Sequence, residues 1–252
     1  MTDRAPLSAV LITRDAAAQL DACLQSVAFC AEILVVDSGS TDGTVTIARS
    51  RGAKVLDHAW LGYGKQKQFA VAQAAHDWVF CIDADEYVSD ELRAAIVAEL
   101  VSPRGFVYAM ARCNRFLGRW LRHGEGYPDW SIRLFHRDHA QWSDDTVHEQ
   151  VLMTAPVLRL AGDLLHDSAD TLERYLEKQN RYTTLQAERL AREGRTTNAA
   201  QLLLSPVVRF VKFYVFRLGF LDGVAGLVHI LIGCMNSFVK YAKLIAMRKP
   251  AR

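Results

Sequence analysis

The first hundred residues alternate between short apolar runs and longer segments in which apolar side chains recur every three or four positions. The runs predict buried strands and the spaced segments predict amphipathic helices. The predicted strands are residues 7–12, 33–36, 53–56 and 78–82. The predicted helices are residues 16–27, 65–75 and 90–101, with another that opens in the turn 38–43 and ends near Arg51. Such alternation is typical of α/β proteins, in which helices cover both faces of a parallel sheet.

Helix ends follow from polar residues at the boundaries of these patterns. Ser40 or Thr41 is expected to cap the second helix, and Ser89 the fourth. After residue 102 the pattern changes to short strands, predicted at residues 105–112, 131–135, 147–152 and 157–160. A long charged helix is predicted over residues 171–193, ended by Gly194, and the chain from Pro206 onward is apolar and helical. We therefore expect a mixed sheet flanked by helices over residues 1–168 and a helical extension over 169–252.

Two acidic segments follow predicted strands, at the edge where open α/β sheets bind ligands. They read DSGSTDGT at 37–44 and DADE at 83–86. Side chains at i and i+2 of an extended strand end point the same way, so Asp83 and Asp85 offer two carboxylates to Mg²⁺ or Mn²⁺. The alternative is that both segments are polar turns that cap the helices after them.

Composition excludes several classes of protein. Of the 252 residues, 50% are hydrophobic and 23% are charged, which excludes a disordered chain. No GxGxxG segment follows a strand, so a nicotinamide-binding site is disfavoured. The five cysteines are odd in number and lack CxxC spacing, which disfavours a disulfide framework and a cysteine-type zinc site. The apolar run 7–12 is too short for a signal peptide, so we expect the body of the protein in the cytosol.

Charge is distributed unevenly along the chain. Residues 201–252 have eight Lys/Arg and one acidic residue, a net +7, whereas residues 1–200 have 22 basic and 27 acidic residues, a net −5. The uncharged stretch 223–239 is at the short limit for a membrane span, and its basic flanks suit anionic lipid head groups. We expect amphipathic helices that lie on a membrane surface. A transmembrane helix and a core-packing or dimerising helix pair are the alternatives.

Several segments together resemble a known family. ITRD at 12–15, VVDSGSTDGT at 35–44 and CIDADE at 81–86 resemble family 2 glycosyltransferases of the GT-A fold. Further segments are similar to the subgroup of lipopolysaccharide core biosynthesis that contains a β-1,4-glucosyltransferase: GYGKQKQFA (62–70), FLGRWLRHG (116–124), YPDWSIRLF (127–135), VHEQV (147–151) and GDLLH (162–166). The resemblance covers nearly the whole chain. It implies a nucleotide-diphospho-sugar transferase-like mixed sheet, with residues 1–168 as the catalytic domain.

The resemblance also implies which residues bind the nucleotide-sugar donor. Thr13, Asp15 and Asp37 would hold the base and ribose of the nucleotide. Lys65 and Gln68 lie where the donor-side helix of the family approaches the nucleotide sugar. These five residues are therefore expected on the donor side of the site.

The metal is implied in the same way. Asp83 would lie near the ribose and the metal, and Asp85 would ligate Mg²⁺ or Mn²⁺ on the diphosphate. His166, in GDLLH, fits the position of a histidine that completes the metal shell. The alternative for His166 is a hydrogen-bonded loop histidine.

Inverting transfer requires one more residue, a carboxylate that takes the proton of the acceptor hydroxyl. The departing diphosphate needs its charge neutralised, which a divalent metal can do. Glu149, in VHE, is the first candidate for the base and Asp145 the second, with Asp144 beside it. The alternative is that these residues cap a turn and pair on a strand.

A loop at residues 112–137 interleaves arginines with aromatic side chains, a combination that suits a phosphorylated glycolipid and equally RNA. The alternative is a loop without a binding role, in which the arginines are solvated and the aromatic side chains belong to the core. The arginines are Arg112, Arg115, Arg119, Arg122, Arg133 and Arg137. The acidic strand ends beside this loop favour the glycolipid interpretation.

Taken together, the sequence predicts a metal-dependent, inverting glycosyltransferase. We expect it to move glucose from UDP-glucose to a lipid-linked acceptor, the heptose of the lipopolysaccharide inner core. We expect a peripheral protein on the cytoplasmic face of the inner membrane, without a nucleic-acid partner. The alternatives are a nucleotidyltransferase, whose glycine-rich basic loop is absent here, and a non-catalytic membrane-associated scaffold.

Overall fold

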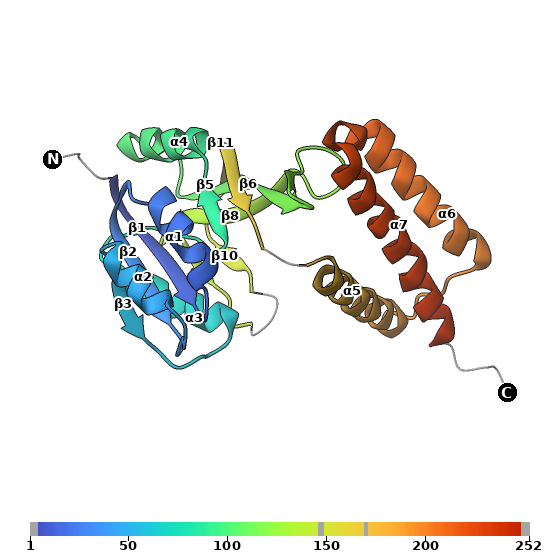
Figure 1. The fold of residues 1–252 in the computed structure, drawn as a ribbon, viewed down its shortest axis with the longest axis horizontal. Coiled ribbons are helices and arrows are strands. Elements are labelled where there is room, and N and C mark those ends of the chain that lie inside the picture. Colours follow the sequence, from blue (N-terminus) through green and yellow to red (C-terminus); the bar gives the residue numbers. More distant parts are fainter. Residues whose placement is uncertain (1–4, 146–148, 169–170, 248–252) are drawn as a thin grey trace. The chain divides into compact units, whose positions relative to one another are not determined.

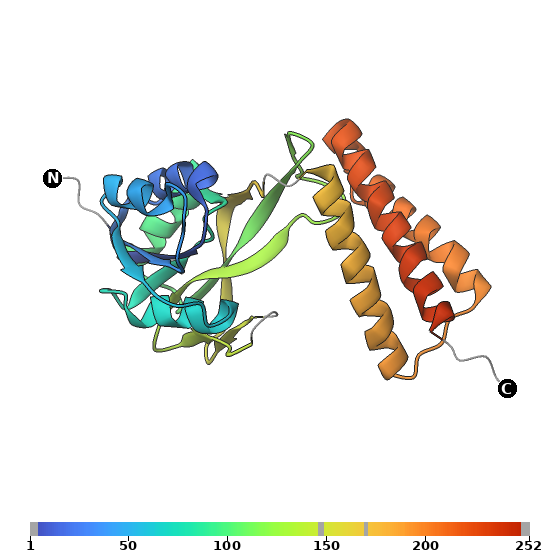
Figure 2. The same cartoon turned by 60° about the horizontal axis from the view of Figure 1, so that its bottom comes forward.

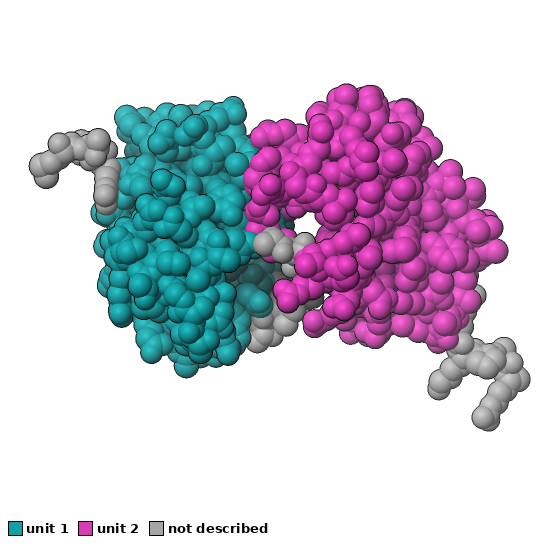
Figure 3. Space-filling view, in the orientation of Figure 1, with its two compact units in different colours: residues 1–112, 129–166 teal, residues 113–128, 167–252 magenta. Residues whose placement is uncertain are grey.

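A computed structural model describes residues 5–145, 149–168 and 171–247 of the chain. The chain forms two compact units, coloured separately in Figure 3. The first unit comprises residues 1–112 and 129–166, and the second comprises residues 113–128 and 167–252. The division after residue 166 is close to the boundary expected at 168. The segment 113–128, expected in the first domain, groups with the helices of the second unit.

The first unit is built on a parallel core of four strands. In order along the chain these are β1 (Ala5–Thr13), β2 (Cys30–Asp37), β3 (Lys54–Asp57) and β4 (Trp78–Cys81). They lie in the order β3-β2-β1-β4, and all three pairings are parallel. The predicted strands therefore exist and are parallel. β1 pairs in parallel with β2, with Thr13 beside Asp37, and with β4, with Val10 beside Cys81, so both acidic segments begin at one edge of the sheet.

The sheet continues past β4 with the strands from the second half of the unit. These are β8 (Asp129–His136), β6 (Val107–Phe116), β11 (Val157–His166) and β5 (Glu86–Val88), in that spatial order. Pairings β4–β8, β6–β8 and β11–β5 are antiparallel, which makes the sheet mixed. A separate two-stranded sheet pairs β9 (Ala140–Trp142) with β10 (Val151–Met153). A short strand β7 (Arg119–Trp120) pairs with the end of β6.

Alternate side chains of β1 point to two different helical layers, as the pleat of a strand requires. Leu7 and Leu11 pack in a core cluster with α1 (Ala17–Ser26), α2 (Thr44–Ser50) and α4 (Asp90–Val101). Val10 packs in a second cluster with α3 (Tyr63–Ala72) and the β9–β10 pair. Figures 1 and 2 show these two layers on opposite faces of the sheet. The continuous apolar run in β1 therefore reflects burial on both faces.

Three element boundaries differ from the sequence predictions. The second helix begins at Thr44, not at a cap on Ser40 or Thr41, because Ser40 instead donates to Asp37. The strand predicted at 157–160 extends to His166. The last helical region begins at Ala199, capped by Asn198, so that Pro206 lies inside a helix rather than at its start. Residues 147 and 148 of another predicted strand lie outside the described residues.

The second unit is a set of helices joined to the segment 113–128. Its helices are α5 (Leu172–Arg192), α6 (Ala199–Phe210) and α7 (Gly223–Ala246), with a π-helical turn over Val211–Phe216 and a 3₁₀ turn over Gly219–Asp222. α7 packs against both α5 and α6, as Figure 2 shows. Asp222 is buried and accepts hydrogen bonds from the backbone N–H groups of Arg122 (3.2 Å) and His123 (2.8 Å). These bonds explain why 113–128 belongs to this unit.

Candidate active site

The carboxyl end of β4 begins the DADE turn, and strand pairing brings a histidine to it. β11 pairs with β5 so that His166 lies opposite Glu86, one residue after Asp85. This register places His166 Nε2 3.2 Å from Asp85 Oδ2. Both side chains are only partly exposed. Asp85 and His166, 81 positions apart in the sequence, thus bring a carboxylate oxygen and an imidazole nitrogen close together.

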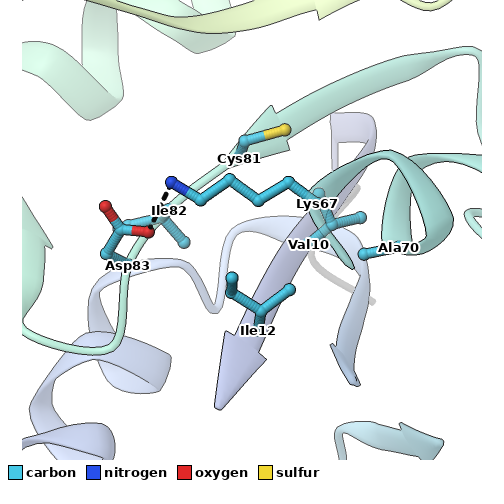
Figure 4. Close-up of a pocket in the computed structure, with 7 residues that line it drawn as sticks. All are labelled: Val10, Ile12, Lys67, Ala70, Cys81, Ile82 and Asp83. Carbon is cyan, nitrogen blue, oxygen red and sulfur yellow. Dashed lines mark ion pairs between the residues drawn. The ribbon is translucent and has the colours of Figure 1, made fainter. Parts of the chain in front are cut away.

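A second charge cluster surrounds Lys67, which extends from α3 along the face of the sheet (Figure 4). Its Nζ lies 3.2 Å from Asp83 Oδ1 and 3.2 Å from Glu149 Oε1. The Nζ also lies 4.7 Å from the centre of the Trp142 ring. The Lys67 side chain is 9% exposed, so these partners replace most of its water. One ammonium group therefore holds both Asp83, the first aspartate of the DADE segment, and Glu149, the leading candidate for the base.

Arg133 supports Asp83 from the neighbouring strand β8. Its Nη2 donates to Asp83 Oδ2 (2.7 Å) and to Glu86 Oε1 (2.7 Å). Burial alone raises the pKa of Asp83, but the charges of Arg133 and Lys67 outweigh it and hold that pKa below its usual value. Glu86 is fully buried, and burial raises its pKa. Asp83 is therefore ionised at neutral pH, in a site that is held together by two cations.

A small pocket lies beneath Lys67, between α3 and the sheet (Figure 4). Its volume is about 10 Å³, enough for one water molecule. Val10, Ile12 and Cys81 form its apolar wall. Burial raises the pKa of the Cys81 thiol to about 11, so the thiol is neutral and this wall is uncharged at neutral pH.

The end of β1 and the 37–44 turn form the other acidic corner of the sheet edge. Thr13 Oγ1 donates to Asp37 Oδ1 (2.8 Å), and the Ser40 backbone N–H donates to Asp37 Oδ2 (2.8 Å). Asp15 accepts from the backbone N–H of Thr41 (2.8 Å) and is exposed, with a positive φ of 50°. The structure thus brings Thr13, Asp15 and Asp37 together, as the sequence predicts. Their roles toward a nucleotide stay predictions.

The donor-side helix α3 presents different residues from those singled out in the sequence. Lys65 is exposed on α3, and the Gln68 side chain accepts a hydrogen bond from the Trp142 backbone N–H (2.9 Å). Their neighbours in the sequence, Gln66 and Lys67, are buried instead. The Gln66 side chain donates to Ser38 Oγ (3.0 Å). The helical phase of α3 could have revealed this, because Gln66, Lys67, Ala70 and Val71 share its buried side. The roles proposed for Lys65 and Gln68 stay predictions.

The candidate bases lie on a segment that is tied to α3. Gly64 approaches this segment so closely that a Cβ there would lie 2.0 Å from the Ser143 carbonyl oxygen. The Gly64 backbone N–H donates to the Asp145 carbonyl (3.3 Å), and Ser143 Oγ donates to the Asp145 carboxylate (2.9 Å). Glu149, by contrast, is only partly exposed and bonds to Lys67. Of the two candidate bases, Glu149 is the one that shares a cation with Asp83.

The residues at this edge fit a divalent metal. Asp85 and His166 converge, and their oxygen and nitrogen donors suit Mn²⁺, with Mg²⁺ favoured by oxygen donors alone. Among the described residues, no three His, Cys, Asp or Glu side chains are grouped to hold a metal by themselves. A metal held by Asp85 and His166 would keep open positions for water and a diphosphate, which is how such metals usually bind nucleotides. When bound, it would supply positive charge to a departing diphosphate.

The arginines of the 112–137 loop do not form one free basic surface. Arg133 is buried in the site. Arg112 is paired with Asp129 at 2.6 Å, Arg115 with Asp167 at 2.7 Å, and Arg137 with Asp77 at 2.6 Å. Four of the six arginines are therefore neutralised by carboxylates. This surface offers less to a phosphorylated acceptor than the sequence suggested.

Comparison with known proteins agrees with the motifs. The family model described as "Glycosyl transferase family 2" matches residues 8–161. A lipopolysaccharide core biosynthesis glycosyltransferase, LpsC of Rhizobium meliloti, is 31% identical over 97% of this chain and 93% of its own. An uncharacterised glycosyltransferase of Rickettsia typhi is 31% identical over 94% of this chain and 86% of its own.

Solved structures give weaker similarities. S. aureus TarS aligns with a TM-score of 0.48 and 16% identity over 97% of this chain and 93% of that one. Glucosyl-3-phosphoglycerate synthase of Mycobacterium tuberculosis, crystallised with Mn²⁺, UDP and glucosyl-3-phosphoglycerate, aligns with a TM-score of 0.38 and 23% identity over 43% of this chain and 44% of that one.

The family match spans the sheet and both acidic corners, and the relatives span nearly the whole chain. The predicted architecture, a GT-A mixed sheet flanked by helices and followed by apolar helices, is confirmed. The nucleotidyltransferase and scaffold alternatives are therefore excluded. The chain belongs to glycosyl transferase family 2 and is a glycosyltransferase.

Proposed function

We propose that this glycosyltransferase moves glucose from UDP-glucose, with inversion, to the heptose of a lipopolysaccharide inner core. The observation that carries the proposal is the meeting of Asp83, Asp85, His166 and Glu149 at one edge of the sheet. The name of the Rhizobium meliloti relative supports the lipopolysaccharide core as acceptor. The donor-side corner at Asp37 supports a nucleotide sugar, because its carboxylate and hydroxyls suit a base and ribose.

The residues of the chain divide the chemistry between them. Glu149 accepts the proton of the acceptor hydroxyl as that oxygen attacks the anomeric carbon, and the bond from this carbon to the phosphate oxygen of UDP breaks, so that UDP leaves. Lys67 orients the Glu149 carboxylate through its 3.2 Å contact. Asp85 and His166 would hold Mg²⁺ or Mn²⁺, with Asp83 on the ribose side of the metal. Asp145, on the same segment, is the second candidate for the base.

The apolar helices of the second unit support a location on a membrane. Residues 199–216 and 219–246 are long and apolar enough to cross a bilayer. Several large side chains of α6 and the following turn are exposed, with Val208 64% and Phe216 77% accessible to solvent. An exposed apolar surface of this kind marks a contact with a membrane or another protein. We place it on the cytoplasmic face of the inner membrane, where nucleotide sugars are available.

The donor is tested by a hydrolysis and transfer screen of the full chain with UDP-, GDP- and CMP-sugars, with Mn²⁺ and Mg²⁺ in separate arms. UDP-glucose with a heptose-terminated, lipid-linked acceptor should give the largest turnover. Turnover with a GDP- or CMP-sugar alone would reject the donor while leaving the family assignment intact.

The membrane location is tested separately with the double variant V208E/F216E. Both side chains are exposed, so the fold should be retained while co-sedimentation with anionic vesicles is lost. Unchanged sedimentation of this variant would reject the proposed surface.

A further inference from the structure

A polar pocket opens among helices α5, α6 and α7 of the second unit. Its volume is about 90 Å³, against about 10 Å³ for the pocket beneath Lys67, so it has space for several water molecules. Gln179 and Thr183 of α5, Arg209 of α6, and Asn236 and Lys240 of α7 are among the lining residues. The pocket is large enough for a small group such as phosphate and too small for a nucleotide.

The charge around this pocket is positive and incompletely neutralised. The Arg209 guanidinium pairs with Glu125 and donates to Ser237 Oγ (3.0 Å), so its charge is balanced. Within residues 5–145, 149–168 and 171–247, no carboxylate forms an ion pair with Lys240, whose Nζ lies 4.5 Å from the centre of the Tyr241 ring. Lys240 therefore brings an unbalanced charge to the pocket.

A second lysine adds to this charge one turn along α7. Lys243 Nζ donates to Thr183 Oγ1 (2.9 Å), Thr184 Oγ1 (2.7 Å) and the Asn180 Oδ1 atom (2.7 Å), all of them neutral oxygens. Thr183 both accepts from Lys243 and lines the pocket. The Lys243 charge is thus fixed beside the cavity, and no carboxylate in the described part of the chain pairs with it.

The placement of polar residues on α7 is also selective. Leu231, Met235 and Phe238 form an exposed apolar stripe on this helix. Asn236, by contrast, donates to Gln179 Oε1 (2.7 Å) and lines the pocket. Polar side chains within apolar, membrane-facing helices are costly and usually mark a binding site. A basic pocket between apolar helices, here α6 and α7, is the arrangement that binds the head group of an anionic lipid.

We propose that this pocket binds the phosphate group of an acidic lipid, with Lys240 as its main cationic contact and the amide and hydroxyl groups of α5 and α7 as further donors. The inference rests on the proposed function in one respect, since it identifies the bound lipid with a phosphorylated glycolipid acceptor. It does not depend on the metal or on the donor.

The test measures binding, without any sugar transfer, by calorimetry on the full chain in neutral detergent. The probes are dihexanoyl phosphatidic acid, inorganic phosphate and dihexanoylglycerol. Lys240→Gln should weaken binding of dihexanoyl phosphatidic acid about tenfold or more, the usual effect of losing a charge-assisted hydrogen bond. Lys178→Gln is the matched control, because Lys178 lies exposed on α5 and does not line the pocket. Dihexanoylglycerol should not bind.

The probes also separate the two sources of phosphate. Tighter binding of dihexanoyl phosphatidic acid than of inorganic phosphate supports a lipid head group, whereas equal affinities support a site for the free anion. Gln186→Leu, at an exposed lining residue, provides a second variant if Lys240→Gln fails to fold.

Two outcomes would overturn the pocket: no binding of either phosphate probe, or equal losses in K240Q and K178Q. Asp85→Ala should bind dihexanoyl phosphatidic acid as the unmodified protein does, because Asp85 lies in the other unit. If the protein transfers glucose to the core but binds neither dihexanoyl phosphatidic acid nor inorganic phosphate, the proposed pocket is wrong and the proposed function stands. A protein that binds the probe but transfers no sugar would reject the proposed function alone.

Discussion

Two strand ends at the same edge of the sheet carry an aspartate, and they hold it in opposite ways. Asp37, at the end of β2, is buried and accepts hydrogen bonds from neutral groups of Thr13 and Ser40. Asp83, after β4, is partly exposed and is held by the cations Lys67 and Arg133. The carboxylate of the first corner is thus held by neutral hydrogen-bond donors. The second gathers charge in excess of what a turn requires, which is the mark of a site built for charged ligands.

The largest expected effect is at the charged corner. Asp85→Ala should abolish sugar transfer, because the pair that it forms with His166 is the part of the site that suits a metal. The melting temperature should change little, since Asp85 is partly exposed and contributes no core packing. Transfer assays with saturating Mn²⁺ and thermal unfolding check both parts. Asp138→Ala, at an exposed aspartate, is the control, and equal activity of the two variants would contradict the metal assignment.

The next effect concerns the base. Glu149→Gln should lower kcat by about 10²–10⁴-fold, the usual contribution of a general base, with a much smaller change in the KM for the donor. Steady-state kinetics with varied UDP-glucose measures both constants. Asp145→Asn, on the same segment, is the matched comparison. If Asp145→Asn shows the larger loss of kcat, the base is Asp145 and Lys67 holds Glu149 for another reason.

The third prediction compares how much the aspartates of the two corners contribute to the free energy of unfolding. Asp83→Asn should lower the free energy of unfolding by about 3 kcal/mol, because it leaves buried cations with one carboxylate fewer. Chemical denaturation of the full chain, followed by tryptophan fluorescence, measures the loss. A variant as stable as the unmodified protein would mean that Lys67 and Arg133 are already balanced by Glu149 and Glu86.

The smallest effect is expected at the neutral corner. Asp37→Asn removes a charge but keeps a side chain that accepts hydrogen bonds, so the loss should be about 1–2 kcal/mol. The same denaturation experiment applies. If Asp37→Asn lowers the free energy of unfolding more than Asp83→Asn does, the contrast between the two corners is wrong, and Asp37 contributes more to stability than Asp83.

The parts of the fold that sequence predicted well are those with long and regular patterns. The parallel strands β1, β2, β3 and β4 follow from apolar runs, and Ser89 caps α4 as expected, since its side chain accepts from the Leu92 backbone N–H. The short strands β5, β7 and β9 were missed, because two or three residues are too few to show a period of two. The end of β11 was missed because Gly162 and Asp163 interrupt its apolar pattern.

The candidate site shows the same limit. The acidic motifs could be found from sequence because they follow strands directly. The cations could not, because the burial of Arg133 on β8 and its contact with Asp83 depend on which strands become neighbours. The family resemblance points to Lys65, whereas helical phase places Lys67, and not Lys65, on the buried side of α3. Pairing between distant segments, rather than local pattern, decides which charges meet.

Gly64 has a consequence for how the site can be adjusted. The absence of a side chain there lets the backbone of α3 touch the chain that leads toward Glu149. Adding one methyl group, in Gly64→Ala, would push that backbone aside without altering any ionisable group. The approach of α3 to the segment of Ser143 and Asp145 is therefore limited by volume: one added carbon atom at position 64 would change how closely these two backbones can lie.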